Sequence, residues 1–464
     1  MRPTQWRTST HLIVATSVLA IVAALVAAAA LLTSNGGGAS AHVPPPPPAI
    51  TAKPGLIPVA ANEPIPSPTA LAEALALAAA DPNLGKLGAR VTDALTGQQL
   101  WQQSDDVLLQ PASTNKTLTS AAALLALDRD ARVTTRVVAA DKPEAAGVIV
   151  LVGGGDPTLS GAAPGQDTWY HGAARLSDLA DQVRRSGVTP TAIQVNTSLF
   201  SGPTFAPGWD PADIEGGDIA PIESVMLDAG RIQPATDESR RSTTPALDAG
   251  HALAAALGVD PQRVTVTSQP VDSGARQLAA VQSAPLIDRL NEMMNVSDNV
   301  MAECIAREVA AAMQRPLSFT GAVAAVTNRL STAHIDTGGA MLQDSSGLSV
   351  EDRLTAKTLD SVVQAAAGPD EPTLRPLLDL LPIAGGSGTL SDRFIDGTPA
   401  GSGPAGWLRA KTGSLTAINA LAGVVTDRSG RVLSFALISN DAGQSGRTAI
   451  DAVAVALWSC GCVT

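Results

Sequence analysis

The sequence predicts an α+β fold in which helices flank an antiparallel sheet and a β-rich region is inserted into the same chain. Two observations carry this prediction. Helix-like text at residues 111–127 and 285–313 is separated by roughly 150 residues of mostly strand-like and loop-like text. Residues 406–440 then hold three apolar strands, and a closing helix follows them.

The first element is an apolar run, residues 12–32, that carries no charge. A run of this length can cross a bilayer as a helix. Arg2 and Arg7 precede it and a long stretch without basic residues follows, so the N-terminus is expected in the cytoplasm and the body outside. Residues 39–41 (Ala-Ser-Ala) also fit a signal cleavage site. We therefore expect residues 1–33 to be a cytoplasmic stub followed by a transmembrane anchor. A cleaved signal peptide is the alternative.

Residues 34–68 are predicted to be a linker rich in proline and glycine. Five consecutive prolines, Pro44 to Pro48, favour the stiff polyproline II conformation. Folding is expected to begin near Thr69, with a helix. Residues 89–103 then predict a hairpin of two short strands around Thr96-Gly97.

The elements that follow predict a split domain. Strand-like segments between residues 135 and 269 are interspersed with helix-like text at 176–187 and 243–258. We therefore assign residues 69–135 and 285–464 to one domain. Residues 136–284 form the predicted insertion.

Composition narrows the classes of function. Hydrophobic residues make up 45% of the 464 and charged residues 16%, which is typical of a globular chain with a large core. The net charge of −12 argues against nucleic acid as a partner, since nucleic-acid binding needs a basic face. Five scattered histidines and the lack of C-x-x-C or H-E-x-x-H spacing give no reason to expect zinc, and we expect no metal or other cofactor.

Three cysteines leave at least one thiol without a partner in the same chain. Cys460 and Cys462 are separated by one residue, which is too tight for an easy loop. A bridge from Cys304 to one of them is the more plausible pairing, and three thiols without a role are the alternative.

Two of the six lysines stand in distinctive settings. Lys116 has Ser113 three residues before it, and Lys411 is followed by Thr412 and Gly413. On a helix, residues three apart share one face. A serine hydroxyl becomes a nucleophile when a base takes its proton, and a lysine amine can act as that base if its pKa falls. We expect burial and the charge of Lys411 to lower the pKa of Lys116; a solvated lysine near a helix start is the alternative.

The other two motifs add to this pattern. Ser297-Asp298-Asn299 would supply a proton relay from Ser297 and an amide at Asn299 that contacts Lys116 and the substrate, or it merely caps a helix. Lys411 and Thr412 would bind a substrate carboxylate, or they lie in a β-turn. Gly413 would let a ligand strand approach closely.

The order S-x-x-K, S-D-N, K-T-G is described for penicillin-binding proteins and class A β-lactamases, in which the first serine is acylated. The chain resembles the class C low-molecular-mass penicillin-binding proteins, which are D-alanyl-D-alanine carboxypeptidases/endopeptidases of peptidoglycan. The resemblance covers about residues 85–460. Besides the motifs, it rests on four stretches: residues 153–159, residues 207–224, Asp344 to Ser349 with Arg353, and residues 381–390.

This resemblance implies a β-lactamase/transpeptidase-like domain with inserted domains. It implies Ser113 as the acylated nucleophile, Lys116 as general base, and Ser297, Asn299 and Lys411 as their partners. The Ser414 N–H would join that of Ser113 in an oxyanion hole.

Asp156, in the glycine-rich stretch, would receive the distal amino group of the peptide, or it is a turn residue that bonds its own backbone. The implied partners are peptidoglycan stem peptides and β-lactam inhibitors, and the implied location is the extracytoplasmic face of the bacterial membrane or the cell wall. A β-lactamase, an esterase with the same site and a non-catalytic wall-binding scaffold are the alternatives.

Overall fold

The computed structural model describes residues 63–140, 147–234, 236, 239–396, 401 and 403–462. The predicted anchor or signal at 1–33 and nearly all of the predicted linker lie outside these residues. Among the helices that the structure describes, none is long and apolar enough to cross a membrane.

The first sheet is antiparallel throughout and has the strand order β10-β11-β12-β1-β2. The predicted hairpin is confirmed: the Asp93 carboxylate accepts hydrogen bonds from the backbone N and the Oγ1 of Thr96, 2.8 and 2.6 Å away. The three predicted C-terminal strands are also confirmed. The bounds are β1 (Lys86–Asp93), β2 (Gln99–Gln103), β10 (Leu408–Leu415), β11 (Ile418–Thr426) and β12 (Val432–Asn440).

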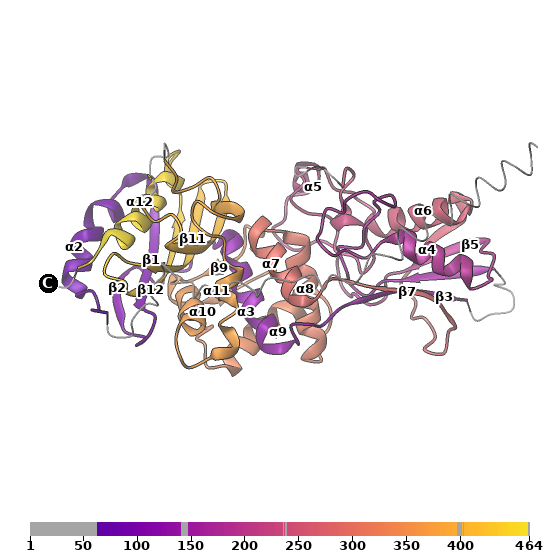
Figure 1. The fold of residues 1–464 in the computed structure, drawn as a ribbon, viewed down its shortest axis with the longest axis horizontal. Helices are drawn as coiled ribbons and strands as arrows, with labels where there is room; N and C mark the ends of the chain where they lie inside the picture. Colours follow the sequence, from indigo (N-terminus) through magenta and orange to yellow (C-terminus); the bar gives the residue numbers. More distant parts are fainter. Residues whose placement is uncertain are drawn as a thin grey trace, which may run out of the picture. The chain divides into compact units, whose positions relative to one another are not determined.

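Alternating residues of this sheet face two different layers of helices. Leu421 and Val425 of β11 pack with α2 (Pro68–Ala79) and α12 (Gly446–Ser459), and Ala420 and Ala422 face the helices of the other layer. Small residues on this second face let the helices approach the sheet closely. Both layers are visible beside the sheet in Figure 1.

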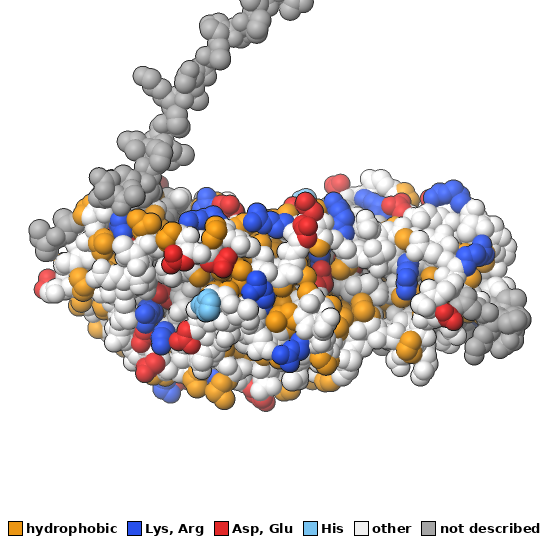
Figure 2. Space-filling view, turned by 90° about the horizontal axis from the view of Figure 1, so that it is seen from below, with side chains coloured by type: hydrophobic (Ala, Val, Ile, Leu, Met, Phe, Trp, Pro, Cys, Tyr) orange, Lys and Arg blue, Asp and Glu red, His pale blue; other side chains and the backbone are white. Residues whose placement is uncertain are grey.

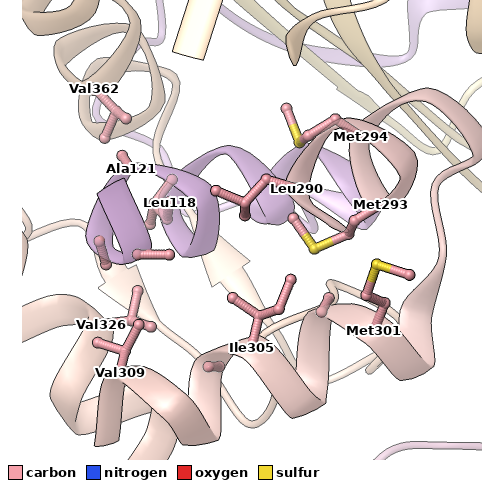
Figure 3. Close-up of a cluster of buried hydrophobic side chains, with 14 of the residues drawn as sticks. Leu118, Ala121, Leu290, Met293, Met294, Met301, Ile305, Val309, Val326 and Val362 are labelled. Carbon is pink, nitrogen blue, oxygen red and sulfur yellow. The ribbon is translucent and has the colours of Figure 1, made fainter. Parts of the chain in front are cut away.

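The second layer is a helical core. In Figure 3, Leu118, Leu290, Met293, Ile305 and Val326 point toward one another. These side chains come from four separate helices, so burying them fixes the helices against one another. The helices of this core are α3 (Lys116–Ala126), α7 (Leu286–Val296), α8 (Asn299–Ala312), α9 (Phe319–Thr332) and α10 (Ala356–Ala367).

The second sheet is built from residues between Thr134 and Gln282, in the order β6-β5-β4-β3-β7. Strands β4, β5 and β6 are parallel, and β3 and β7 are antiparallel to their neighbours. Helices α4 and α6 bury one face of the sheet. The bounds are β3 (Thr134–Ala139), β4 (Val148–Val152), β5 (Ala192–Asn196), β6 (Val264–Thr267), β7 (Gln277–Gln282), α4 (Leu176–Arg185), α5 (Ala212–Gly216) and α6 (Pro245–Leu257).

The α+β class is thus confirmed, and helices contribute more to the inserted region than a β-rich prediction suggests. The limits of the insertion, 136–284, stay a prediction. Short elements complete the described chain: the 3-10 helices η1 (Pro82–Leu84), η2 (Ala112–Asn115), η4 (Asp228–Gly230), η5 (Pro261–Arg263), η6 (Pro372–Leu374) and η7 (Gly388–Leu390), with α11 (Leu377–Leu380), β8 (Ala340–Met341) and β9 (Arg353–Leu354).

The charged side chains do not gather by sign on the face shown in Figure 2, where basic and acidic groups are interspersed. This face offers no broad basic surface for a nucleic-acid backbone.

The expected disulfide was wrong. Cys460 is bonded to Cys462, with their Cα atoms 5.0 Å apart, and Cys304 is a free thiol inside α8. The bridge forms because the chain leaves its helical conformation at Cys460, where α12 ends.

Cys304 is expected to be unreactive in the folded protein, because it is buried and burial raises the pKa of its thiol. A thiol reagent should label no cysteine before denaturation and one after it. Rapid labelling of the native chain would contradict this burial.

Candidate active site

The Ser113 hydroxyl lies next to a buried amine. Residues Ala112–Asn115 form the 3-10 turn η2, and α3 continues from Lys116. Lys116 Nζ donates to Ser113 Oγ at 2.9 Å, to Asn299 Oδ1 at 2.5 Å and to the Ser346 carbonyl at 2.9 Å. The predicted one-turn spacing therefore brings nucleophile and base into hydrogen-bond reach, and three acceptors hold the amine in place.

The turn before Ser113 is held between two glycines. Ala112 has a φ of 48°, which is unfavourable for an L-residue. A Cβ on Gly413 would lie 2.7 Å from the Pro111 carbonyl oxygen, and a Cβ on Gly347 would lie 1.9 Å from the Ala112 carbonyl oxygen. Gly413 was expected to make room for a ligand strand; the space is instead used by the protein's own nucleophile turn.

The S-D-N motif joins two helices at the site. Ser297 ends α7 with a φ of 61°, and the Asp298 carboxylate caps α8 by accepting from Met301 N at 2.9 Å. Helix capping, the alternative interpretation, is therefore real, but it coexists with contacts to both lysines. Lys411 Nζ donates to Ser297 Oγ at 2.9 Å and to its neighbouring carbonyl at Thr412, 3.0 Å away.

Burial is the main reason that both lysines lose their usual basicity. It lowers the pKa of Lys116 to about 8, although nearby carboxylates partly oppose it. Burial, with the charge of Lys116, lowers the pKa of Lys411 well below its ordinary value. We expected both burial and the charge of Lys411 to lower the pKa of Lys116, and burial is the cause that the structure supports. The opposing carboxylates belong to Asp344, Asp298, Glu303 and Asp218.

Strand β10 is an edge strand whose second half is open toward the cleft. Near its start, Ala384 N donates to the Leu408 carbonyl and Ala410 N donates to the Pro382 carbonyl, both at 3.0 Å. Backbone groups alternate in direction along a strand, so those of Thr412 and Ser414 point to the same, open edge. An extended peptide could pair there, with the Ser414 N–H free to face its carbonyl.

These residues border a cleft of about 590 Å³. Ser113, Ser297, Asn299, Thr412 and Ser414 line it. Lys116 and Lys411 lie buried directly behind the serines to which they donate. The other lining residues are Asp213, Asp218, Val296, Gly347, Leu348, Thr389, Asp392, Arg393, Leu415, Thr416 and Arg447.

The structure does not bring Asp156 to this cleft. Its side chain is buried, and one carboxylate oxygen accepts from the backbone N and the Oγ1 of Thr158, 2.8 and 2.6 Å away. Burial raises the pKa of Asp156. The turn interpretation describes this geometry, because the carboxylate bonds the backbone two residues further along the chain.

Several cleft residues were not singled out from the sequence. The Ser346 carbonyl accepts from Lys116, Thr389 Oγ1 lies 2.7 Å from Thr412 Oγ1, and Asp213 and Asp218 reach the cleft from the inserted region. Ser346 and Thr389 lie in stretches that contribute only to the family resemblance of the sequence. Within the described part of the chain, no group of three His, Cys, Asp or Glu side chains could hold a metal ion.

A serine hydroxyl beside a buried lysine amine, at the border of a cleft, is an arrangement typical of enzymes that use serine as their nucleophile. The chain belongs to the D-Ala-D-Ala carboxypeptidase 3 (S13) family, whose model matches residues 71–240 and 235–458. It is therefore a serine-type D-Ala-D-Ala carboxypeptidase. A second family model, the N-terminal domain of Carboxypeptidase Rv3627c-like proteins, matches residues 1–58.

Two relatives match the chain over its whole length. The chain is 68% identical over 466 residues to Carboxypeptidase Rv3627c of Mycobacterium tuberculosis. It is 65% identical over 462 residues to Carboxypeptidase DacB of Mycolicibacterium smegmatis, and both matches cover 100% of each chain. The crystal structure of penicillin binding protein 4 from Haemophilus influenzae is similar in fold, with a TM-score of 0.68 and 22% identity. That match covers 84% of this chain and 98% of the other.

Proposed function

We propose that this enzyme releases the terminal D-alanine of peptidoglycan stem peptides through an acyl-enzyme on Ser113. The observation that carries the proposal is the buried Lys116 amine 2.9 Å from Ser113 Oγ, with its pKa lowered to about 8. A tenth of such an amine is unprotonated one pH unit below its pKa, which is enough to accept the serine proton near neutrality.

Acylation and deacylation would proceed in the following steps. Ser113 Oγ attacks the carbonyl between the two D-alanines while its proton passes to Lys116 Nζ. The oxyanion is stabilised by the N–H groups of Ser113 and Ser414. The C–N bond then breaks, and the leaving amine takes a proton from Ser297 Oγ. Ser297 is reprotonated by the proton that Lys116 took from Ser113. Water completes the cycle by hydrolysing the ester and releasing the shortened peptide.

The roles of the remaining residues follow from their contacts. Lys411 donates to the Ser297 hydroxyl and would hold it in position for proton transfer to the leaving amine. Asn299 fixes Lys116 through its Oδ1 and donates its Nδ2 to the Asp218 carbonyl at 3.0 Å. Thr412 and Thr389, with adjoining hydroxyls, would bind the terminal carboxylate. Asp156 has no place in this scheme.

β-Lactams are the expected inhibitors, because the ring carbonyl presents the same target to Ser113 and the opened ring cannot diffuse away. A crystal structure of the Haemophilus influenzae penicillin binding protein 4 contains a β-lactam. The proposal also includes cleavage of peptidoglycan cross-links and a location on the extracytoplasmic side of the membrane. Residues 1–33 would be the membrane anchor.

The acyl-enzyme is tested by measuring intact protein mass after incubation with penicillin. We expect one adduct on the wild-type chain and none on Ser113→Ala. A Ser349→Ala variant, which removes another hydroxyl near the cleft, should keep the adduct. Equal labelling of the Ser113 variant would contradict the assignment of the nucleophile.

A further inference from the structure

The single tyrosine of the chain reaches the S-D-N motif from the inserted region. Tyr170 is buried, and its hydroxyl donates to Asp298 Oδ2 at 2.6 Å. Arg231 Nη1 donates to the same hydroxyl at 2.6 Å and lies 3.7 Å from Asp298 Oδ2. The Arg231 guanidinium also lies 4.4 Å from the centre of the Trp169 ring, and this cation–π contact helps to hold it in place.

These contacts keep a fully buried carboxylate ionised. Burial alone would raise the pKa of Asp298, but the charges of Arg241 and Arg231 and the hydrogen bonds from Tyr170 and Met301 N hold it below its ordinary value. A buried charge with this many donors has one stable position, because any movement breaks strong hydrogen bonds in a medium of low dielectric.

Asp298 lies between the two motif residues that contact the lysines. Ser297 adopts a left-handed conformation, which a residue with a side chain keeps only when its surroundings impose it. From there its Oγ meets Lys411, and Asn299 Oδ1 on the other side meets Lys116. A fixed Asp298 side chain therefore fixes the peptide bonds on both sides of it.

A second contact from the inserted region supports the same motif. Asn299 Nδ2 donates to the Asp218 carbonyl, and Arg241 Nε donates to the adjacent Gly217 carbonyl at 2.8 Å. Arg241 also donates to the Ala229 carbonyl at 2.7 Å. Both Asp298 and Asn299 are thus held by residues of the inserted region.

We propose that Tyr170 is a positioning residue, which acts through Asp298 to align Ser297 and Asn299 with the two lysines. The inserted region is then part of the catalytic apparatus. This inference rests on the proposed function, because it takes from it the roles of Ser297 and Asn299. A purely structural Tyr170 would affect how much enzyme folds and leave the rate of each folded molecule unchanged.

The test is a double-mutant cycle of Tyr170→Phe and Asp298→Asn, read as the rate constant of penicillin acylation and the fraction of enzyme that is acylated. Asparagine at 298 still caps α8, so this variant keeps the helix start. We expect Tyr170→Phe to be acylated completely but about 10- to 100-fold more slowly, as for loss of a hydrogen bond to a charged group. In the Asp298→Asn background the same change should cost about twofold or less.

The control is Arg175→Gln, which alters another arginine of the inserted region that donates to the Ala163 and Gln166 carbonyls. It should react at the wild-type rate. If Tyr170→Phe cannot be purified folded, Arg231→Lys takes its place in the cycle, and the same slowing is expected. If the effects of Tyr170→Phe and Asp298→Asn on the acylation rate were fully additive, the inference would be overturned. It would also be overturned if Tyr170→Phe kept the wild-type rate with a smaller acylated fraction. Neither result would contradict the proposed function. A wild-type chain without adduct would overturn the proposed function with it.

Discussion

Replacing Lys116 with glutamine is expected to slow penicillin acylation by about 10³- to 10⁴-fold, the upper range for loss of a general base. Glutamine fills similar space but cannot take the proton of Ser113. The Asn299 and Ser346 acceptors would still find an N–H donor, so the site should stay folded. The measurement is the acylation time course by intact mass, with thermal unfolding as a check on stability.

The same amine sets the pH dependence of the wild-type enzyme. Its pKa is lowered to about 8, so the unprotonated form falls about tenfold for each pH unit below that value. The acylation rate should therefore decline on the acid side and level off above about pH 8, and Lys116→Gln should lose this limb. Lys357→Gln, which removes an exposed partner of Asp336, is the matched control. A wild-type rate that is constant from about pH 5 to pH 9 would point to another base.

Replacing Gly347 with alanine is expected to lower the acylation rate at least about 100-fold, because a displacement near 1 Å at a reacting group has that effect. Gly347 has a φ of 81°, and an added Cβ would lie 1.9 Å from the Ala112 carbonyl oxygen. That oxygen belongs to backbone, so it can move only by shifting the turn that carries Ser113. The neighbouring Ser346 carbonyl, which accepts from Lys116, would move with it.

A matched control separates backbone strain from this displacement. Gly258 has a φ of 72° and would have nothing within 4 Å of an added Cβ. Gly258→Ala should cost about 1–2 kcal/mol of stability, the penalty of a left-handed alanine, without changing the acylation rate per folded molecule. The comparison uses the free energy of unfolding and the acylation rate of both variants. Equal acylation rates would show that the nucleophile turn tolerates the added carbon.

The sequence predicted those parts of the site that depend on local geometry. Ser113 and Lys116 are three residues apart at a helix start, and this spacing alone places them on one face. The three C-terminal strands were predicted from three short, mostly apolar stretches within residues 406–440. Lys411 could be placed on one of these strands for the same reason.

Two local features differ from what the sequence pattern suggested. Asp156 was expected at the substrate, but its carboxylate bonds Thr158 in a local turn. Cys460 was expected to be too near Cys462 to pair with it, and the end of α12 allows the bridge. Neither outcome can be read from spacing, since each depends on the backbone conformation at one residue.

By itself the sequence determined that a serine and a lysine share one helical face and that two further motifs follow them in order. Only the tertiary structure decided that Lys116 is buried enough to lose its proton near neutrality, and that Tyr170 lies against Asp298, 128 residues away. The physical reason is that helix and strand periodicity are local properties. The pKa of an amine and the position of a buried carboxylate depend on every group packed around them.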